Sequence, residues 1–278
     1  MSGTAVTATD LVVAYGGHVA IDTSTFTIPS GTVTAIIGPN GSGKSSLLNA
    51  ISGLVSPAGG SIDTPGVTST RRIAYVLQTT RVNEALPISV KEVVTMGRYS
   101  SVGAYRRLDA ADKAAIAEAM KRMDIVDISS RHLHDLSGGQ RQRVFVAQGL
   151  AQDHDILLLD EPMTGIDLPT AQAIDSVIHD ETSRGCSVIM TTHDLSEAQV
   201  ADHVLLLSGR VIASGPPSAV LTRDNLVAAY GQSLLHVGES GTVFLDDPAH
   251  APIPGRHSHR ERTIHTEVSR SDLHGDSP

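Results

Sequence analysis

The sequence predicts a mixed α/β fold with an inserted helical segment, and three observations carry that prediction. Short aliphatic or β-branched runs have the character of strands buried inside a parallel sheet, namely 33–37, 73–77, 156–159 and 188–192. A glycine-rich loop follows the first run and leads into helical spacing of apolar residues at 46–51. Between about 79 and 150, helical patterns replace strand patterns.

The glycine-rich segment predicts a phosphate-binding loop. Gly38 and Gly43 flank four residues and are followed by Lys44 and Ser45, so backbone N–H groups can turn inward at the start of a helix. Lys44 is expected to reach the β- and γ-phosphates, and the Ser45 hydroxyl is expected to bind Mg²⁺. The register of the motif argues against a glycine-rich turn that binds nothing. The expected nucleotide contacts are Gly38, Pro39, Asn40, Gly41, Ser42, Gly43, Lys44, Ser45 and Ser46.

An acidic pair follows the strand predicted at 156–159. Asp160 would emerge at the carboxyl end of that strand, where open α/β sheets place ligands, so it is the expected Mg²⁺ partner. Glu161 lies one residue further and points elsewhere, which suits a carboxylate that polarises the attacking water. A solvated acidic pair is the alternative, and Pro162 together with the upstream phosphate loop argues against it.

The pentapeptide 136–140, Leu-Ser-Gly-Gly-Gln, lies just ahead of the acidic strand and is expected to begin a helix. Its hydroxyl and backbone N–H groups would form an anion site at the helix N-terminus, from Ser137, Gly138, Gly139 and Gln140. Further upstream, Asp109 can cap a helix whose apolar face is formed by Ile116, Met120 and Met123.

With these motifs in this order, the chain resembles the ATP-binding subunit of an ATP-binding-cassette (ABC) transporter over roughly residues 5–230. The resemblance implies a P-loop NTPase core with an N-terminal antiparallel β subdomain and a helical subdomain at about 79–150. It implies a nucleotide-binding domain over 1–235 and a C-terminal extension over 236–278. ATPase activity with ATP and Mg²⁺ is expected.

The same resemblance assigns further roles. Tyr15 would stack on adenine, although a half-buried strand tyrosine is the alternative reading. Gln78 would sense Mg²⁺ and the attacking water, His193 would hydrogen-bond the γ-phosphate and position Glu161, and Asp167 would lie at a dimer contact. The implied metal ligands are Ser45, Gln78 and Asp160.

The resemblance also implies an assembly. Two copies would pack head to tail, so that Ser137 and Gly139 complete the pocket of the other copy. The expected partners are two transmembrane permease subunits and, indirectly, an extracytoplasmic metal-binding protein, with the chain at the cytoplasmic face of the cell membrane.

The segment 86–99, followed by 103–107, resembles the ATPases of zinc and manganese importers. It predicts uptake of a divalent metal ion, zinc or manganese. Some siderophore and haem importers carry a related Met-Gly-Arg segment, so an importer of iron-siderophore or haem remains an alternative. An exporter, or a soluble ABC protein acting on ribosomes or DNA, is a further alternative.

The end of the chain is rich in Asp, Pro, Ser, Arg and His, and is expected to be disordered. Its imidazoles could bind zinc, and a solvated tail without a specific role is the alternative. The candidate ligands are His250, His257, His259 and His265.

Bulk properties exclude some classes of protein. A net charge of -9 argues against a nucleic-acid binder, and the one cysteine, Cys186, excludes an intramolecular disulfide. No apolar run reaches the length of a membrane-spanning helix, and the start lacks a signal-peptide pattern. Any transmembrane path is therefore expected to belong to another chain.

Overall fold

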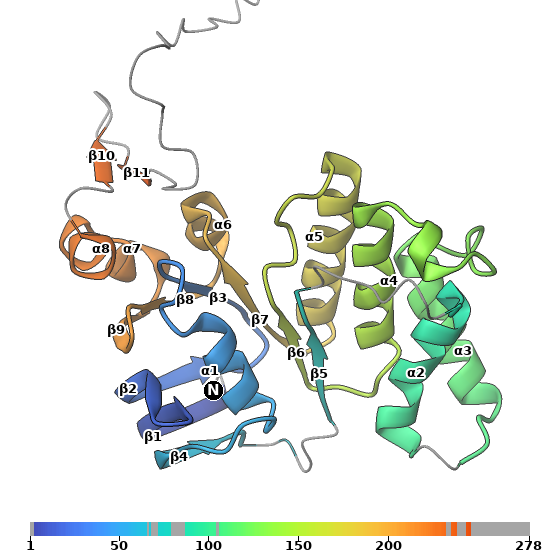
Figure 1. Ribbon diagram of the computed structural model, residues 1–278, viewed down its shortest axis with the longest axis horizontal. Coiled ribbons are helices and arrows are strands. Elements are labelled where there is room, and N and C mark those ends of the chain that lie inside the picture. Colours follow the sequence, from blue (N-terminus) through green and yellow to red (C-terminus); the bar gives the residue numbers. More distant parts are fainter. Residues whose placement is uncertain are drawn as a thin grey trace, which may run out of the picture. The chain divides into compact units, whose positions relative to one another are not determined.

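A computed structural model describes residues 3–65, 67, 72–78, 87–103, 106–231, 235–237 and 243–245 of the chain (Figure 1). The first of two compact units extends to Leu245, and the second, Asp246–Pro278, lies outside the described residues. The four candidate tail ligands, His250, His257, His259 and His265, fall in that second unit. In the first unit the structure confirms the α/β core, the N-terminal antiparallel sheet and the helical insertion.

The central sheet has six strands in the order β5-β6-β7-β3-β8-β9. Five of them run parallel, and β9 pairs antiparallel with β8 at one edge. In sheet order the strands are β5 (Ile73–Val76), β6 (Ile156–Leu159), β7 (Ser187–Thr192), β3 (Val33–Ile37), β8 (His203–Leu207) and β9 (Val211–Gly215). The four runs that predicted buried strands are therefore β3, β5, β6 and β7, which are neighbours in this sheet.

A second sheet is antiparallel, in the order β2-β1-β4. Its strands are β1 (Thr4–Tyr15), β2 (His18–Pro29) and β4 (Gly59–Asp63). Gly16 and Gly17 join β1 to β2 with φ of 54° and 88°. Positive φ at both central residues is what a tight hairpin turn with matching twist requires, and glycine adopts it without steric cost.

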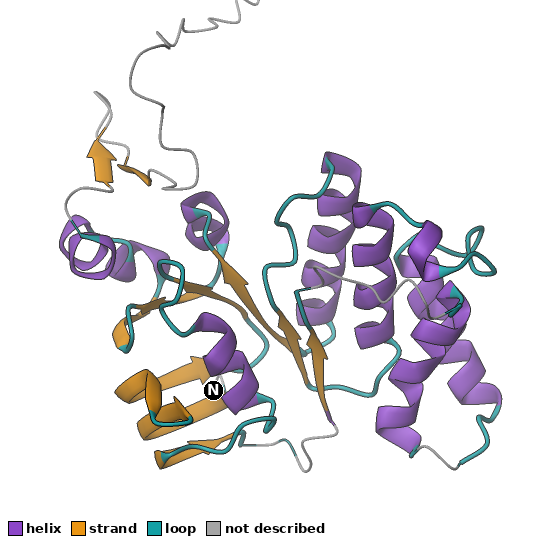
Figure 2. Ribbon diagram, viewed as in Figure 1, coloured by secondary structure: helices purple, strands orange, loops and turns teal. Residues whose placement is uncertain are grey.

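The helices lie on both faces of the central sheet (Figure 2). They are α1 (Lys44–Ile51), α2 (Val90–Val102), α3 (Ala110–Arg122), α4 (Gly138–Leu150), α5 (Leu168–Ser183), α6 (Leu195–Val200), α7 (Pro217–Val220) and α8 (Arg223–Tyr230), with a 3₁₀ turn at Leu133–Asp135. A short antiparallel hairpin, β10 (Leu235–Val237) and β11 (Val243–Leu245), follows α8. None of the helices in the described ranges combines the length and the apolar composition needed to cross a bilayer.

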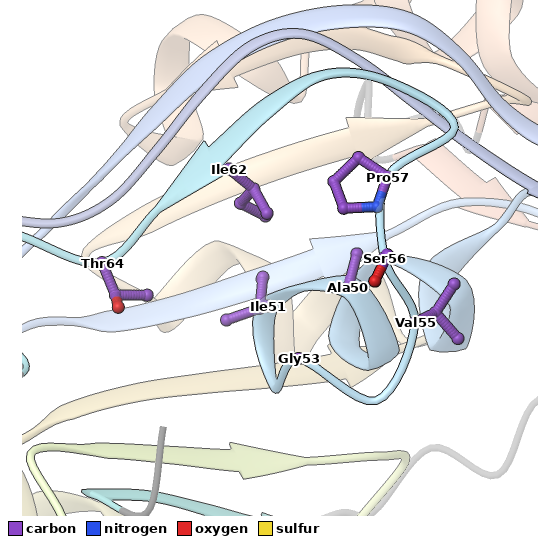
Figure 3. Close-up of a pocket in the computed structure, with 8 residues that line it drawn as sticks. All are labelled: Ala50, Ile51, Gly53, Val55, Ser56, Pro57, Ile62 and Thr64. Carbon is purple, nitrogen blue, oxygen red and sulfur yellow. The ribbon is translucent and has the colours of Figure 1, made fainter. Parts of the chain in front are cut away.

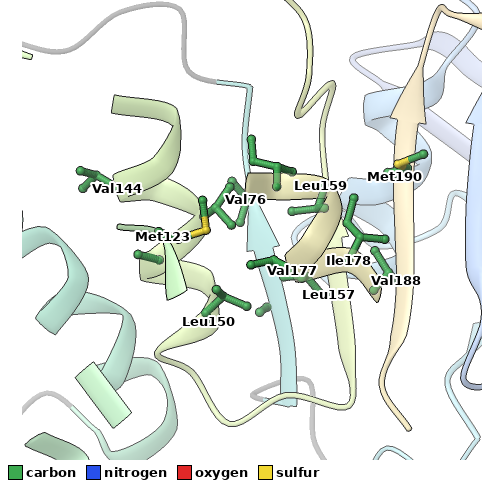
Figure 4. Close-up of a cluster of buried hydrophobic side chains, with 14 of the residues drawn as sticks. Val76, Met123, Val144, Leu150, Leu157, Leu159, Val177, Ile178, Val188 and Met190 are labelled. Atoms are coloured by element: carbon green, nitrogen blue, oxygen red, sulfur yellow. The ribbon is translucent and has the colours of Figure 1, made fainter. Parts of the chain in front are cut away.

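Strand β6 shows why the sheet is buried on both faces. Leu157 and Leu159 point into a core shared with α4 and α5 (Figure 4), whereas Ile156 and Leu158 pack in a second core with α1 and the antiparallel sheet. All four side chains are at most 1% exposed. Successive side chains of a strand face opposite sides, so a strand with helices on one side and a sheet with α1 on the other must be apolar throughout.

Helix α3 of the helical insertion begins at the residue that the sequence predicts. Asp109 caps α3 by accepting a hydrogen bond from the backbone N–H of Asp112, and the Asp112 side chain accepts in return from the Asp109 N–H. Ile116, Met120 and Met123 are all buried against the helical core. The predicted apolar face of this helix is therefore confirmed.

Helices α2 and α4 cross at very close range. A Cβ atom added to Gly97 of α2 would lie 2.0 Å from the backbone carbonyl oxygen of Gln148 in α4. At the next residue of α4, a Cβ added to Gly149 would lie 2.7 Å from Cγ2 of Val76 in β5. Glycine at these two positions lets α4 approach both a helix and a strand.

Arg98, part of the segment that resembles metal importers, is an internal structural residue. Its guanidinium bonds Asp112 of α3 at 2.7 Å and Asp153 in the α4–β6 loop at 2.6 Å. The side chains of Arg98 and Asp112 are 10% and 3% exposed. Arg98 therefore joins α2, α3 and the loop that leads into β6.

Replacing Arg98 with alanine is expected to destabilise the fold by about 3–5 kcal/mol, because Asp112 would be left as a buried, unpaired charge. Urea unfolding of the nucleotide-free chain measures this change. Arg106→Ala is the matched control, since its ion pair with Asp109 has side chains that are 59% and 52% exposed. A control loss below about 1 kcal/mol is expected, and equal losses for the two variants would contradict the assignment.

Candidate nucleotide-binding and hydrolysis site

The predicted phosphate loop connects the end of β3 to the first turn of α1. A Cβ on Gly38 would lie 2.1 Å from the Leu207 carbonyl oxygen, and one on Gly43 would lie 2.6 Å from the Ala20 carbonyl oxygen. Gly43 also has φ of 101° at the N-cap of α1. Both flanking glycines are therefore required by the backbones that approach the loop.

The start of α1 is suited to an anion. No side chain caps it, and its first turn carries no acidic residue. The leading N–H groups of a helix carry partial positive charge and lack partners within the helix, so they are available to a phosphate. Ser45 is exposed at this end, and Ser46 is half-buried behind it.

The Lys44 ammonium lies within the loop. It donates to the carbonyl oxygens of Gly38 at 2.9 Å and Pro39 at 3.2 Å, and the residue is 6% exposed. Burial lowers the pKa of Lys44 below its usual value, and the nearby carboxylates of Glu161 and Asp160 oppose that shift. A cation is thus held between the loop and the acidic strand.

The two carboxylates that follow β6, those of Asp160 and Glu161, lie in different environments. Asp160 is 6% exposed and accepts a hydrogen bond from the Thr191 hydroxyl at 2.6 Å. Glu161 adopts φ of 45°, a left-handed conformation that is uncommon outside glycine and that clusters at functional sites. This turn separates the two adjacent side chains.

Thr191 is a residue that the motifs did not single out. Its hydroxyl donates to Asp160 and accepts the backbone N–H of Glu161 at 2.8 Å, and the residue is fully buried in β7. One hydroxyl therefore fixes both acidic residues. The signal in the sequence is only a threonine after the apolar residues 188–190, one position before the end of β7.

Gln78 and Glu161, which sequence treats as separate motifs, are in contact. The Gln78 amide nitrogen donates to the Glu161 carboxylate at 2.8 Å. Val76 and Leu159 are register partners of the parallel strands β5 and β6, and each of the two side chains follows its strand by two residues. The paired strands thus bring both groups to the same edge of the sheet.

His193 directly follows β7 and is exposed at this carboxyl edge. Tyr15 ends β1, is 41% exposed, and its hydroxyl lies 3.5 Å from the amide nitrogen of Asn49 in α1. The structure therefore places His193 at the edge that carries Asp160 and Glu161, and places Tyr15 beside the helix that follows the phosphate loop. Their roles toward a nucleotide stay predictions.

The pentapeptide begins α4, as predicted. The Ser137 hydroxyl accepts the Gln140 backbone N–H at 3.2 Å, and the Gln140 side chain accepts the Ser137 N–H at 3.1 Å, which is a complete capping box. Asp167 caps α5 in the same way, by accepting the Thr170 N–H at 2.9 Å. Hydrogen bonds from the hydroxyl and backbone N–H of Thr170 lower the pKa of Asp167 and favour its charged form.

The starts of α4 and α5 lie against each other. A Cβ on Gly139 would lie 2.9 Å from the Thr170 hydroxyl oxygen and 3.4 Å from a carboxylate oxygen of Asp167. The anion site at Ser137 and the predicted dimer-contact loop at Asp167 therefore form one surface feature, which sequence spacing did not reveal.

A separate shallow pocket of about 220 Å³ lies at the far end of α1, beside β4 (Figure 3). Its lining residues are Ala50, Ile51, Gly53, Val55, Ser56, Pro57, Ile62 and Thr64. None of the predicted nucleotide contacts belongs to it.

The arrangement matches a known family. The sequence model of the family described as ABC transporter matches residues 21–164. The chain belongs to the ABC transporter ATPase family. It is an ATP-binding ABC ATPase, as the resemblance of its motifs implied.

Several relatives of this ABC ATPase span most of its length. The chelated iron transport system membrane protein YfeB of Yersinia pestis is 39% identical over 83% of this chain and 80% of its own. The zinc transport system ATP-binding protein TroB of Treponema pallidum is 40% identical over 86% and 90%. The manganese transport system ATP-binding protein MntB of Bacillus subtilis is 38% identical over 81% and 92%.

The fold is also similar to solved structures. CbiO1 of Clostridium perfringens, described as part of the ABC transporter complex cbiONQ, superposes with a TM-score of 0.67 at 27% identity. The similarity covers 81% of this ABC ATPase and 94% of that chain. It supports the same overall fold for the two chains.

Thr191→Val is expected to lower the ATP turnover rate about tenfold or more, because the lost hydroxyl leaves the Asp160 carboxylate and the Glu161 N–H without their shared partner. Nucleotide affinity, measured by equilibrium binding, should change much less than turnover. Thr191→Ser keeps the hydroxyl and should restore most of the rate. Equal rates for the valine and serine variants would show that the hydroxyl does not position these groups.

Proposed function

We propose that this chain is the ATP-hydrolysing subunit of an importer that powers uptake of a divalent metal ion, zinc or manganese, across the cytoplasmic membrane. The observation that carries the proposal is the 35–40% identity, over most of the chain, to ATP-binding proteins named for manganese and zinc transport. An iron-chelate cargo is the second candidate, because YfeB is similar over the same length.

The permease contact is proposed on the side of the helical insertion that includes α2. Met96 of α2 is 52% exposed and Leu77, next to Gln78, is 55% exposed, so large apolar side chains face outward there. The neighbouring Gly97 and Arg98 are used for internal packing and ion pairing. Met96 and Leu77 are thus the better candidates for contact with two transmembrane subunits. The chain would be held at the cytoplasmic face of the membrane through them.

The residues for ATP and Mg²⁺ are proposed from the donor groups at the carboxyl edge of the sheet. Lys44 and the start of α1 would hold the phosphates. Ser45, Asp160 and Gln78 offer a hydroxyl, a carboxylate and an amide oxygen, which are hard donors that suit Mg²⁺. When bound, Mg²⁺ supplies neutralisation of the charge on the β- and γ-phosphate oxygens.

Glu161 is proposed as the group that polarises the attacking water. Its contact with the Gln78 amide nitrogen orients the carboxylate, and the left-handed turn separates it from Asp160. His193, at the neighbouring strand end, would hydrogen-bond the γ-phosphate. A base of this kind acts by accepting the proton of the water as it attacks, which requires an ionised carboxylate held at hydrogen-bond distance.

A head-to-tail homodimer is proposed because α1 and α4 each begin with a predicted phosphate-binding motif. Neither α1 nor α4 carries an acidic residue in its first turn. One would bind ATP from its own loop, and the other, at Ser137 and Gly139, would complete the site of the second copy. Asp167 lies against the α4 start and would therefore be close to the dimer contact.

Glu161→Gln keeps the shape of the side chain but removes the base, so hydrolysis is expected to fall by about 10²–10⁴-fold while ATP still binds. The ATP-bound dimer should then accumulate, as measured by light scattering after gel filtration. Glu118→Gln, on the exposed face of α3, is the matched control and should behave as the wild type. Normal phosphate release by the Glu161 variant would remove Glu161 as the base.

Uptake of labelled zinc, manganese and chelated iron, measured separately in cells that lack the chain, tests the cargo. Zinc or manganese uptake should be lost, restored by the wild type and not restored by Lys44→Ala, which cannot bind phosphate normally. If only the uptake of chelated iron depends on the chain, the second candidate cargo is favoured. Unchanged uptake of all three would contradict metal import.

A further inference from the structure

A second group of polar side chains lies at the amino ends of the central strands, whereas the nucleotide site lies at their carboxyl ends. His154 precedes β6 by two residues, Cys186 precedes β7 by one, and Glu181 lies in the last turn of α5. These are the amino ends of the parallel strands, whereas Asp160 and Thr191 lie at or near their carboxyl ends. The phosphate chemistry does not use this group.

The three side chains bring their ligand atoms together. A His154 ring nitrogen, the Cys186 sulfur and a Glu181 carboxylate oxygen all lie within 4.8 Å of one another. The His154 and Glu181 side chains are 6% and 4% exposed, and Cys186 is 8% exposed. The backbone N–H of Cys186 donates to the Glu181 carbonyl oxygen at 3.0 Å, which fixes these two residues in one turn.

The orientation of His154 is set by its second ring nitrogen. Nδ1 lies 2.9 Å from the backbone carbonyl oxygen of Gln152, so it must carry hydrogen to bond there. Nε2 then faces the Glu181 carboxylate at 3.0 Å. In the metal-free chain a proton between Nε2 and the carboxylate makes this contact favourable, and a metal ion bound by both groups would replace that proton.

We propose that His154 Nε2, Glu181 Oε2 and Cys186 Sγ form a binding site for a borderline divalent cation of the zinc type. Imidazole and thiolate ligands favour Zn²⁺ or Co²⁺, whereas Mg²⁺ and Mn²⁺ favour oxygen donors, so the site would discriminate against the metal of the nucleotide site. In the metal-free chain the Cys186 thiol donates to the His154 carbonyl oxygen at 3.2 Å. Metal binding breaks this hydrogen bond and releases the thiol proton, and any proton on Nε2, to solvent. Water completes the tetrahedral coordination.

The geometry and the surroundings suit this ligand set. Ligands at about 2.0–2.2 Å in a tetrahedron place nitrogen and oxygen about 3.3–3.6 Å apart, so the observed 3.0 Å contact must open by a few tenths of an ångström to admit the ion. A backbone carbonyl that accepts from the other ring nitrogen is the usual support of a metal-binding histidine. Arg122 of α3 donates to Glu181 Oε1 at 2.5 Å, which leaves Oε2 to face the site.

Arg122 connects this proposed metal site to the helical insertion, so metal binding is expected to affect that insertion. Its side chain is 9% exposed and joins α3 to α5 through Glu181. A cation on Oε2 withdraws charge from the carboxylate and weakens its bond to Arg122. The site therefore couples cytoplasmic metal to the junction between α3 and the core, whatever the transporter carries.

Cobalt spectroscopy of the full-length chain tests the site directly. Thiolate-to-cobalt charge-transfer absorption reports Cys186 alone, because it is the one cysteine in the sequence, so histidines elsewhere cannot produce it. The metal-free wild type titrated with Co²⁺ should develop this band to saturation at one equivalent, and Zn²⁺ should displace it. An absent band in the wild type would overturn the proposal.

Variants separate the ligands from their surroundings. Cys186→Ser should abolish the band, and His154→Gln should weaken Co²⁺ binding at least about tenfold. His179→Gln is the matched control on α5, because His179 also faces a carboxylate, Asp175, but is 71% exposed. It should leave the band unchanged. Unchanged affinity in the His154 variant, with folding verified by circular dichroism, would overturn the proposal.

A wild-type measurement covers the case in which a ligand variant does not fold. One equivalent of Zn²⁺ should slow the reaction of Cys186 with a thiol reagent, and a chelator should restore the rate. An unchanged rate with zinc would contradict the site. None of these readouts uses ATP turnover or transport, so they are independent of the proposed cargo.

Discussion

The parallel pairing of β6 with β5 and β7 is the interaction on which the rest of the structure depends. Its register places Gln78, Asp160, Glu161 and Thr191 at one edge of the sheet, where hydrogen bonds join them into one group. The same pairing brings His154 and Cys186 together at the other edge. A strand can hold that register because both of its faces are buried, and a shift by one residue would exchange the two cores.

The packing that supports this register relies on a few close approaches and one internal ion network. Gly38 and Gly43 let neighbouring backbones approach the phosphate loop, and Gly149 lets α4 rest on Val76 of β5. Arg98 neutralises Asp112 between two helices. Gly149 and Arg98 act away from the reacting groups, whereas the two loop glycines belong to the predicted phosphate site itself. Each of the four residues fixes an element that carries a group of the site. Positioning in this protein is therefore distributed through the core.

Sequence predicted the parts of the site that have local signals. The strand, loop and helix around the predicted phosphate loop, the capping role of Asp109 and the helix start at Ser137 each depend on residues within a few positions of one another, and the structure confirms this local geometry. Phosphate binding by the loop stays a prediction. The hydrogen bond between Gln78 and Glu161 joins residues 83 positions apart, and the hydrogen bond between Thr191 and Glu161 joins residues 30 positions apart. The periodicity of a sequence cannot predict contacts between residues so far apart. From the sequence, Gly149 could be described only as a residue that weakens its helix. Its structural role is the close contact between α4 and strand β5, which the sequence does not reveal.

The close crossing of α2 and α4 has a mechanical consequence. Gly97 faces the Gln148 carbonyl, so the two helix backbones meet here with no side chain of α2 between them. A push on α2 therefore moves α4 directly, and with it the Ser137 end of that helix. The backbone contact therefore links the exposed face of α2 at Met96 to the capping box at Ser137, at the start of α4.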